Sequence, residues 1–160
     1  MEQKEVRTLL EQVAAGAVDV EAAMLKLKEA PFEDLGFAKP DHHRALRQGI
    51  AEVIYGAGKT PEQIAGIARA MLENGQETIL ITRLAPDAAA QVRETLPLRY
   101  FDTARCGVLG DLPAPGGLGT IVIATGGTSD LPVAEEAALT AQALGNRVTR
   151  LYDVGVAGLH

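Results

Sequence analysis

The sequence predicts an α/β protein in which a small helical hairpin precedes alternating strands and helices. Short aliphatic runs alternate with stretches of helical spacing, and turns rich in Gly, Pro, Thr and Asp separate them. Aromatic residues make up only 4% of the chain and hydrophobic residues 47%, so the core must be aliphatic. One aliphatic run, at 121–124, leads directly into a glycine turn and a helix start, an arrangement that α/β proteins use to hold an anion.

Residues 1–30 are expected to form a hairpin of two amphipathic helices. In the first helix four apolar residues recur at helical spacing: Val6, Leu9, Leu10 and Val13. Gly16 ends that helix, Asp19 can cap a second one, and Pro31 stops it. The hairpin is expected to pack or dock, and it carries no residues that indicate chemistry.

Residues 31–49 break the helical periodicity and form a predicted linker. The linker concentrates basic and imidazole side chains: Lys39, His42, His43, Arg44 and Arg47. Arg44 and Arg47 are three residues apart and would share a helix face, either as surface charges or as a clamp for a phosphate or carboxylate. His42 and His43 are adjacent, so they point in different directions, and no third ligand has metal-like spacing. We therefore expect solvated or phosphate-facing histidines rather than a metal site.

Residues 50–110 predict a small α/β domain with a parallel sheet. Strands are expected at 52–55, at 78–82 and within 98–109, with helices starting at Pro61 and Pro86 between them. The proline- and glycine-rich segment 110–118 then marks a domain boundary.

The turn from Gly56 to Thr60 resembles the end of a P-loop, because a strand precedes it and a helix follows it. Val53 stands where that motif needs a glycine, so we expect no triphosphate site. Two interpretations remain: a plain turn capped by Thr60, or a turn in which Lys59 contacts an anionic group of a ligand.

Residues 119–160 predict a strand, a glycine turn, a helix with Pro132 in its first turn, and a second strand at 148–152. The turn consists of Gly126, Gly127, Thr128, Ser129 and Asp130. Free N–H groups and the helix dipole favour an anion there, so these residues are candidates for binding a phosphate or ribose hydroxyls. The alternative is a tight turn that merely needs glycines. His160 would reach the same sheet edge and could transfer protons.

Two parallel strands and one helix cannot cover both faces of a parallel sheet. Either the strands of 119–160 join the preceding sheet, or the chain is a fragment. We favour the fragment.

Composition and charge exclude several classes of protein. The net charge of −6 without a basic stripe argues against nucleic-acid binding. The single cysteine, Cys106, excludes a disulfide framework, and with no neighbouring base it is expected to be a structural thiol. No apolar run approaches the ~20 residues of a membrane span, and residues 1–10 lack a secretion signal. We expect a cytoplasmic protein without a membrane partner.

The segment from Ile123 to Pro132 resembles the aminoimidazole ribonucleotide carboxylase (PurE-like) family. That family binds the nucleotide phosphate and ribose with a glycine-serine-x-serine-aspartate-x-proline segment. Gly126, Ser129, Asp130 and Pro132 fall on this pattern, whereas Gly127 stands where the family has its first serine. His160 falls, after a gap, where the family has the histidine of an alanine-histidine-arginine motif.

Four segments extend the resemblance over essentially the whole chain: LGFAKPDHHRALRQG, EVIYGAGKT, TSDLPVAEEAALTAQALGNRV and RLYDVGVAGLH. In these segments the chain is similar to the LarB family, the pyridinium-3,5-biscarboxylic acid mononucleotide synthases. The resemblance implies that 119–160 begins a PurE-like domain with a three-layer αβα sheet, and that this domain forms a homo-oligomer when complete. The ring-attacking cysteine of that family belongs to a later part of the domain, so Cys106 does not match it, and the resemblance implies that residues 1–160 lack the catalytic cysteine.

The same resemblance implies the activity. LarB enzymes carboxylate the nicotinate ring of nicotinic acid adenine dinucleotide at C5 and cleave its phosphoanhydride, releasing AMP. Their product feeds the nickel-pincer cofactor of lactate racemase. CO2 or bicarbonate is the co-substrate, Mg²⁺ could assist the cleavage, and no tightly bound organic cofactor is expected. The alternatives are a purine-pathway carboxylase, against which residues 1–110 argue, and a non-catalytic nucleotide-binding or assembly module.

Overall fold

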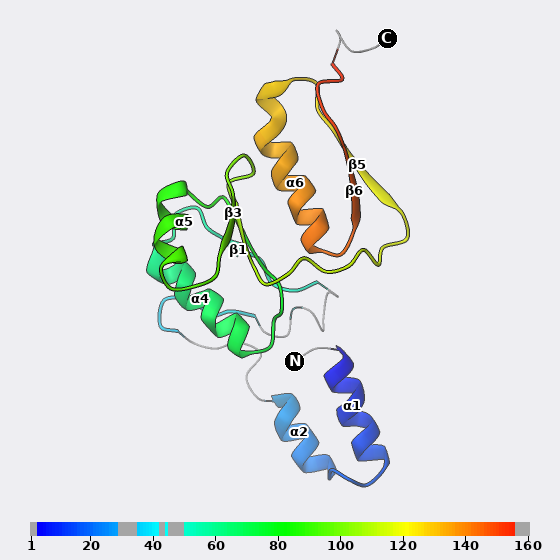
Figure 1. Ribbon diagram of the computed structural model, residues 1–160. Coiled ribbons are helices and arrows are strands. Elements are labelled where there is room, and N and C mark those ends of the chain that lie inside the picture. The colour runs from blue at the N-terminus through cyan, green and yellow to red at the C-terminus, as the bar shows by residue number, and fades with distance from the viewer. Residues whose placement is uncertain (1–2, 29–34, 42–43, 45–49, 156–160) are drawn as a thin grey trace. The chain divides into compact units, whose positions relative to one another are not determined.

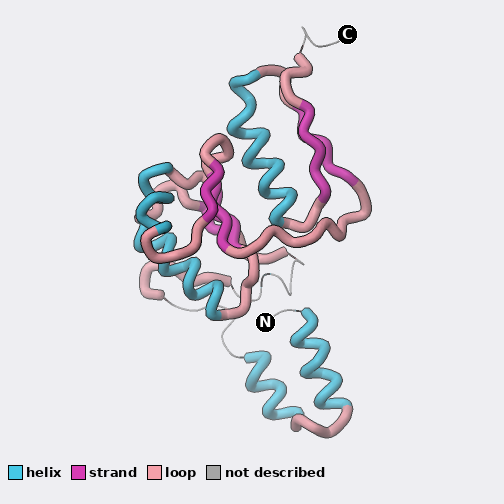
Figure 2. The backbone as a smooth tube through the Cα atoms, viewed as in Figure 1, coloured by secondary structure: helices cyan, strands magenta, loops and turns pink. Residues whose placement is uncertain are grey.

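The computed structural model describes residues 3–28, 35–41, 44 and 50–155 (Figures 1 and 2). The chain falls into two compact units. The first unit is Met1–Glu52 with Arg69–Gln76, and the second is Val53–Ala68 with Glu77–His160. The α/β class predicted from the sequence is confirmed.

The first unit contains the predicted pair of helices, α1 (Gln3–Ala14) and α2 (Val20–Lys28). Leu9 and Ala23 are buried where the two helices pack. Gly16 follows α1 with a φ of +70°, a backbone conformation that favours glycine. Asp19 Oδ1 accepts the Ala22 N–H at 2.9 Å, so the predicted cap of α2 is confirmed. The predicted stop at Pro31 lies outside the described residues.

The second unit contains a four-stranded sheet in the order β1-β2-β4-β3. Its strands are β1 (Ile54–Tyr55), β2 (Ile79–Thr82), β3 (Arg99–Phe101) and β4 (Cys106–Leu109). β1 and β2 pair in parallel, as predicted. The prediction of a parallel sheet is wrong for the remainder, because β4 pairs antiparallel with both β2 and β3.

The chain reverses between β3 and β4, where the sequence predicted one strand within 98–109. The Arg105 N–H donates to the Asp102 carbonyl at 3.0 Å, and Arg105 adopts a φ of +49°. A hairpin can be joined by such a short turn, whereas a parallel strand would need a long crossover. The sheet is therefore mixed rather than parallel.

Helices lie on both sides of this sheet. α4 (Pro61–Glu73) and α5 (Pro86–Arg93) are the two predicted helices that begin at prolines. Figure 1 shows α5 and the 61–68 part of α4 on one side of the sheet and α6 (Leu131–Ala143) on the other. The four-stranded sheet of the second unit is therefore covered by helices on both faces.

The predicted strand–helix–strand segment forms β5 (Thr120–Ala124), α6 and β6 (Arg147–Leu151), with β5 and β6 paired in parallel. α6 packs on the four-stranded sheet through Leu139, which clusters with Leu80, Ala104, Cys106 and Val108. β5 and β6 do not join that sheet; their helix covers it instead. Residues on both sides of 110–118 belong to this one unit, and the domain boundary there stays a prediction.

Candidate nucleotide-binding site

The glycine turn, residues 126–130, connects the carboxyl end of β5 to the amino end of α6. Its last three residues form a short 3-10 helix, η1 (Thr128–Asp130). The Asp130 N–H donates to the Gly127 carbonyl at 3.2 Å, and the Gly127 N–H donates to Asp130 Oδ2 at 3.1 Å. The side chains of Thr128, Ser129 and Asp130 are all exposed. The structure thus brings the predicted hydroxyls and carboxylate together at a strand end.

Asp130 has a structural role that the sequence did not indicate. Because its Oδ2 accepts the Gly127 N–H, the carboxylate closes the turn in which it lies. A negative charge at this place repels an anion on the helix axis. A phosphate would therefore be bound towards the hydroxyls of Thr128 and Ser129, and Asp130 is suited to accept hydrogen bonds from hydroxyl groups.

Residues 152–155, the loop after β6, lie against the glycine turn. Thr125 Oγ1 accepts the Asp153 N–H at 3.1 Å, and the Thr125 carbonyl accepts the Val154 N–H at 2.9 Å. A Cβ on Gly155 would lie 2.2 Å from the Gly126 carbonyl oxygen, so the two backbones are in close contact. Both loops therefore occupy one edge of the β5–β6 sheet, as predicted for parallel strands. His160 lies outside the described residues, so its predicted place at this edge stays a prediction.

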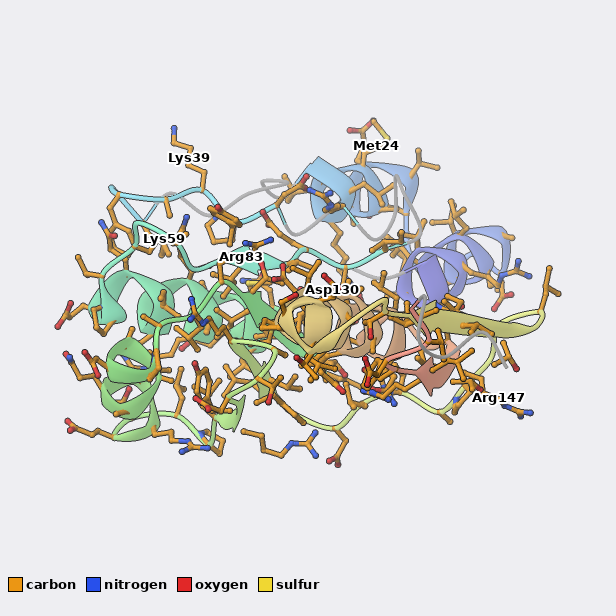
Figure 3. All side chains as sticks on the ribbon, turned by 90° about the horizontal axis from the view of Figure 1, so that it is seen from above. Met24, Lys39, Lys59, Arg83, Asp130 and Arg147 are labelled. Carbon is orange, nitrogen blue, oxygen red and sulfur yellow. The ribbon has the colours of Figure 1, made fainter. Side chains whose placement is uncertain are left out.

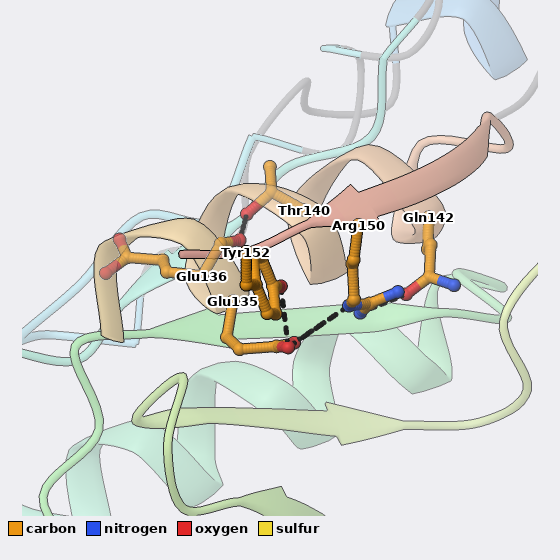
Figure 4. Close-up of polar contacts among 6 residues, drawn as sticks. All are labelled: Glu135, Glu136, Thr140, Gln142, Arg150 and Tyr152. Carbon is orange, nitrogen blue, oxygen red and sulfur yellow. Dashed lines mark hydrogen bonds and ion pairs between the residues drawn. The ribbon is translucent and has the colours of Figure 1, made fainter. Parts of the chain in front are cut away.

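A polar network fixes β6 and its loop to α6 (Figure 4). Glu135 accepts hydrogen bonds from Arg150 Nε at 3.1 and 3.2 Å and from the Tyr152 hydroxyl at 2.7 Å. Arg150 Nη2 also donates to Gln142 Oε1 at 3.1 Å. Burial and the neighbouring Glu135 carboxylate raise the pKa of Tyr152, so its hydroxyl keeps its proton and remains a donor.

Thr60, at the end of the turn after β1, caps α4. Thr60 Oγ1 accepts the Gln63 N–H at 3.3 Å, and Gln63 Oε1 accepts the Thr60 N–H at 3.0 Å. The pKa of Glu62 is lowered by a hydrogen bond to its own backbone N–H and, to a smaller extent, by one to the Thr60 hydroxyl. A carboxylate is therefore also present at the amino end of α4. This arrangement favours the plain turn over a phosphate loop. Lys59 stays a candidate for contacting an anionic group of a ligand, through its side chain only.

Arg83 is a candidate that sequence reasoning missed. It follows β2 directly, adopts a φ of +52°, and its Nε lies 2.8 Å from Glu136 Oε2 of α6. Gly56 contacts the same strand end, because its N–H donates to the Thr82 carbonyl at 2.7 Å. Lys59 and Arg83 thus follow neighbouring parallel strands, and Figure 3 labels both together with Asp130. A basic residue directly after a buried strand was the signal that could have found Arg83.

Comparison with known proteins places these features in a family. The family model for the LarB/PurE-like N-terminal domain matches residues 32–111, which is half of the 160-residue chain. The chain belongs to this family. The match includes Arg44, Lys59 and Arg83, whereas the glycine turn lies beyond it.

A curated relative extends the similarity beyond that range. An uncharacterized protein of Methanocaldococcus jannaschii is 27% identical over 164 residues, which cover 98% of this chain. The chain spans 64% of the length of that relative. The similarity to the relative therefore includes the segment of the glycine turn.

Two further predictions for this LarB-family chain concern single side chains. Cys106 is fully buried, in agreement with the structural role predicted for it. Burial, and to a smaller extent the negative charge of Glu136, raises the pKa of its thiol to about 11.

Arg44 is exposed and lies in the first unit. Arg47, the other half of the predicted clamp, lies outside the described residues, as do His42 and His43.

Within the described ranges, no three His, Cys, Asp or Glu side chains gather as a resident metal ion would require. In the same ranges, no helix combines the length and the apolar character needed to span a bilayer.

Proposed function

We propose that this LarB-family chain supplies the nucleotide-binding part of an enzyme that carboxylates nicotinic acid adenine dinucleotide at C5 of its nicotinate ring. The same enzyme would cleave the phosphoanhydride and release AMP, and its product would feed the nickel-pincer cofactor of lactate racemase. The glycine turn carries the proposal, because it presents two hydroxyls and a carboxylate at the carboxyl end of β5. The family match over 32–111 supports it.

Each group at the site would have a distinct role in binding. Thr128 and Ser129 would donate hydrogen bonds to a phosphate, and Asp130 would accept hydrogen bonds from ribose hydroxyls. Lys59 and Arg83 would offset the charge of the second phosphate of the dinucleotide. The carboxyl ends of β1, β2 and β5 supply these residues.

The reaction needs a nucleophile and a base besides this binding site. Addition of a nucleophile to the cationic pyridinium ring gives an enamine-like carbon that can attack CO2. Loss of the proton from the carboxylated carbon and departure of the nucleophile then restore the aromatic ring. His160 is our candidate for proton transfer. Cys106 is not the nucleophile, because its thiol is buried in the core and has a raised pKa.

Mg²⁺ fits this site only together with the substrate. Mg²⁺ commonly binds through one or two carboxylates and the phosphates of a bound nucleotide. Asp130 could supply one carboxylate to such an ion, whose role would be to neutralise charge on the phosphoanhydride. The binding roles of Thr128, Ser129 and Asp130 do not depend on it.

Product analysis tests the proposal. The full-length protein is incubated with nicotinic acid adenine dinucleotide and bicarbonate, and the products are separated and weighed by mass spectrometry. We expect AMP and a mononucleotide that carries one carboxyl group more than nicotinic acid mononucleotide. The two products should form in equal amounts and only with bicarbonate. Tight binding without any turnover would contradict the enzymatic proposal and support a non-catalytic nucleotide-binding module.

A further inference from the structure

Thr125 stands out among the described residues because it is the buried polar side chain, with an exposed fraction of 5%. It lies between the last residue of β5 and the first residue of the glycine turn. A polar side chain in such a place must find hydrogen-bond partners within the protein. Its partners therefore indicate what the residue does.

All the hydrogen bonds of Thr125 lead to the segment at the end of β6. Its N–H donates to the Leu151 carbonyl at 3.1 Å, and its carbonyl accepts the Val154 N–H at 2.9 Å. Its hydroxyl oxygen accepts the Asp153 N–H at 3.1 Å. Thr125 thus continues the pairing of β5 with β6 past the end of both strands, and its hydroxyl contacts the neighbouring loop.

The loop that Thr125 holds has an otherwise unfavourable backbone. Asp153 adopts a φ of +57°, which a residue with a side chain seldom takes up. Gly155 lies so close to the Gly126 carbonyl that a Cβ would approach it to 2.2 Å. The Asp153 N–H bond to Thr125 and the contact of the two glycines hold the 152–155 loop against the glycine turn.

We propose that Thr125 is a positioning residue that joins the glycine turn and the 152–155 loop into one preformed wall for a nucleotide. This inference rests on the proposed function, because it assumes that the glycine turn binds the phosphate and ribose. The ligand contacts the turn, and the turn keeps its place relative to the next loop through Thr125. Preorganisation of this kind raises affinity by removing the cost of ordering the loops on binding.

A pair of substitutions tests the hydroxyl itself. Thr125→Val keeps the shape of the side chain and removes the acceptor, whereas Thr125→Ser keeps the acceptor. We expect Thr125→Val to weaken binding of nicotinic acid adenine dinucleotide by about tenfold in calorimetry, and Thr125→Ser to restore most of that affinity. Thr120→Val, the same change at the other end of β5, is the matched control and should bind as the unsubstituted protein does.

A measurement on the unsubstituted protein keeps the test valid even if Thr125→Val does not fold. Bound dinucleotide should slow amide exchange at Asp153 and Val154 as well as in the glycine turn, because Thr125 joins the two segments. Slowed exchange in the turn alone, or unchanged affinity in Thr125→Val, would overturn the inference. Failure of the inference leaves dinucleotide binding by the unsubstituted protein intact, whereas failure of the proposed function means that the unsubstituted protein binds no dinucleotide. The two failures are therefore distinguishable.

Discussion

The Cys106 thiol lies in the apolar cluster formed by β2, β4 and α6, and its Sγ donates to the Ala104 carbonyl at 3.2 Å. Burial in this cluster removes water from the thiol and disfavours the thiolate, which is the reactive form. The Glu136 carboxylate acts in the same direction. A side chain that would be a candidate nucleophile on the surface is therefore a core residue here.

We predict that Cys106 in the folded protein does not react with a thiol reagent at pH 8, and reacts at once in denaturant. The raised pKa also predicts a pH dependence. The pKa of Cys106 in the folded protein, about 11, exceeds its ordinary value of 9.0. The protonated thiol therefore contributes fully to the free energy of unfolding below pH 9, and this contribution is lost as pH rises towards 11. Thermal melts should show a smaller loss over that window in Cys106→Ala, and an equal loss in both proteins would contradict the assignment.

Helix α6 belongs to two structures at once. It connects β5 to β6, and through Leu139 it also covers the four-stranded sheet. The Arg83–Glu136 ion pair joins the same helix to the end of β2, but 53% of the Arg83 side chain is exposed. Apolar burial contributes far more than an exposed ion pair, so Leu139 should dominate the attachment of α6.

We predict that Leu139→Ala lowers the free energy of unfolding by about 2–4 kcal/mol, because it leaves a cavity between α6 and the sheet. Glu136→Gln should cost less than about 1 kcal/mol, since it breaks only a partly exposed ion pair. Val133→Ala, on the exposed side of α6, is the matched control. Urea unfolding measures all three, and a cost of Leu139→Ala no larger than that of Val133→Ala would show that α6 does not cover the sheet.

Local signals explain which elements could be predicted from the sequence. The glycine turn and α6 were predictable because the glycines and Pro132 act within a few residues of the helix start. The reversal between β3 and β4 was not, because the turn at 102–105 contains no glycine or proline and Arg105 takes the positive φ instead. The prediction of one strand within 98–109 in a parallel sheet failed for the same reason.

Contacts between distant segments explain what the sequence missed in the candidate site. Arg83 and Glu136 are 53 residues apart, and no periodicity in the sequence indicates their pairing. The Thr125–Asp153 hydrogen bond joins residues 28 apart on two different loops. The sequence located the hydroxyls and the carboxylate of the glycine turn, whereas the residues that hold the turn in place became apparent only from the fold.

At the scale of the whole molecule, the second unit contains two sheets, and α6 contacts a strand of the four-stranded sheet as well as β5 and β6. β1 and β2 supply Lys59 and Arg83, and β5 supplies the glycine turn at the amino end of α6. The family match covers Lys59 and Arg83, and the similarity to the Methanocaldococcus jannaschii protein extends over the glycine turn. The proposed dinucleotide site uses both sets, which agrees with their presence in one compact unit.

Asp130→Asn tests the central proposal most directly. The amide oxygen of Asn can still accept the Gly127 N–H, so the turn is kept while the carboxylate is lost. We predict that calorimetry with nicotinic acid adenine dinucleotide shows an affinity at least about tenfold lower in Asp130→Asn, with an unchanged melting temperature. Asp111→Asn, an exposed carboxylate outside the turn, should bind normally. Equal affinity of Asp130→Asn and the unsubstituted protein would contradict the assignment of the glycine turn as the nucleotide site.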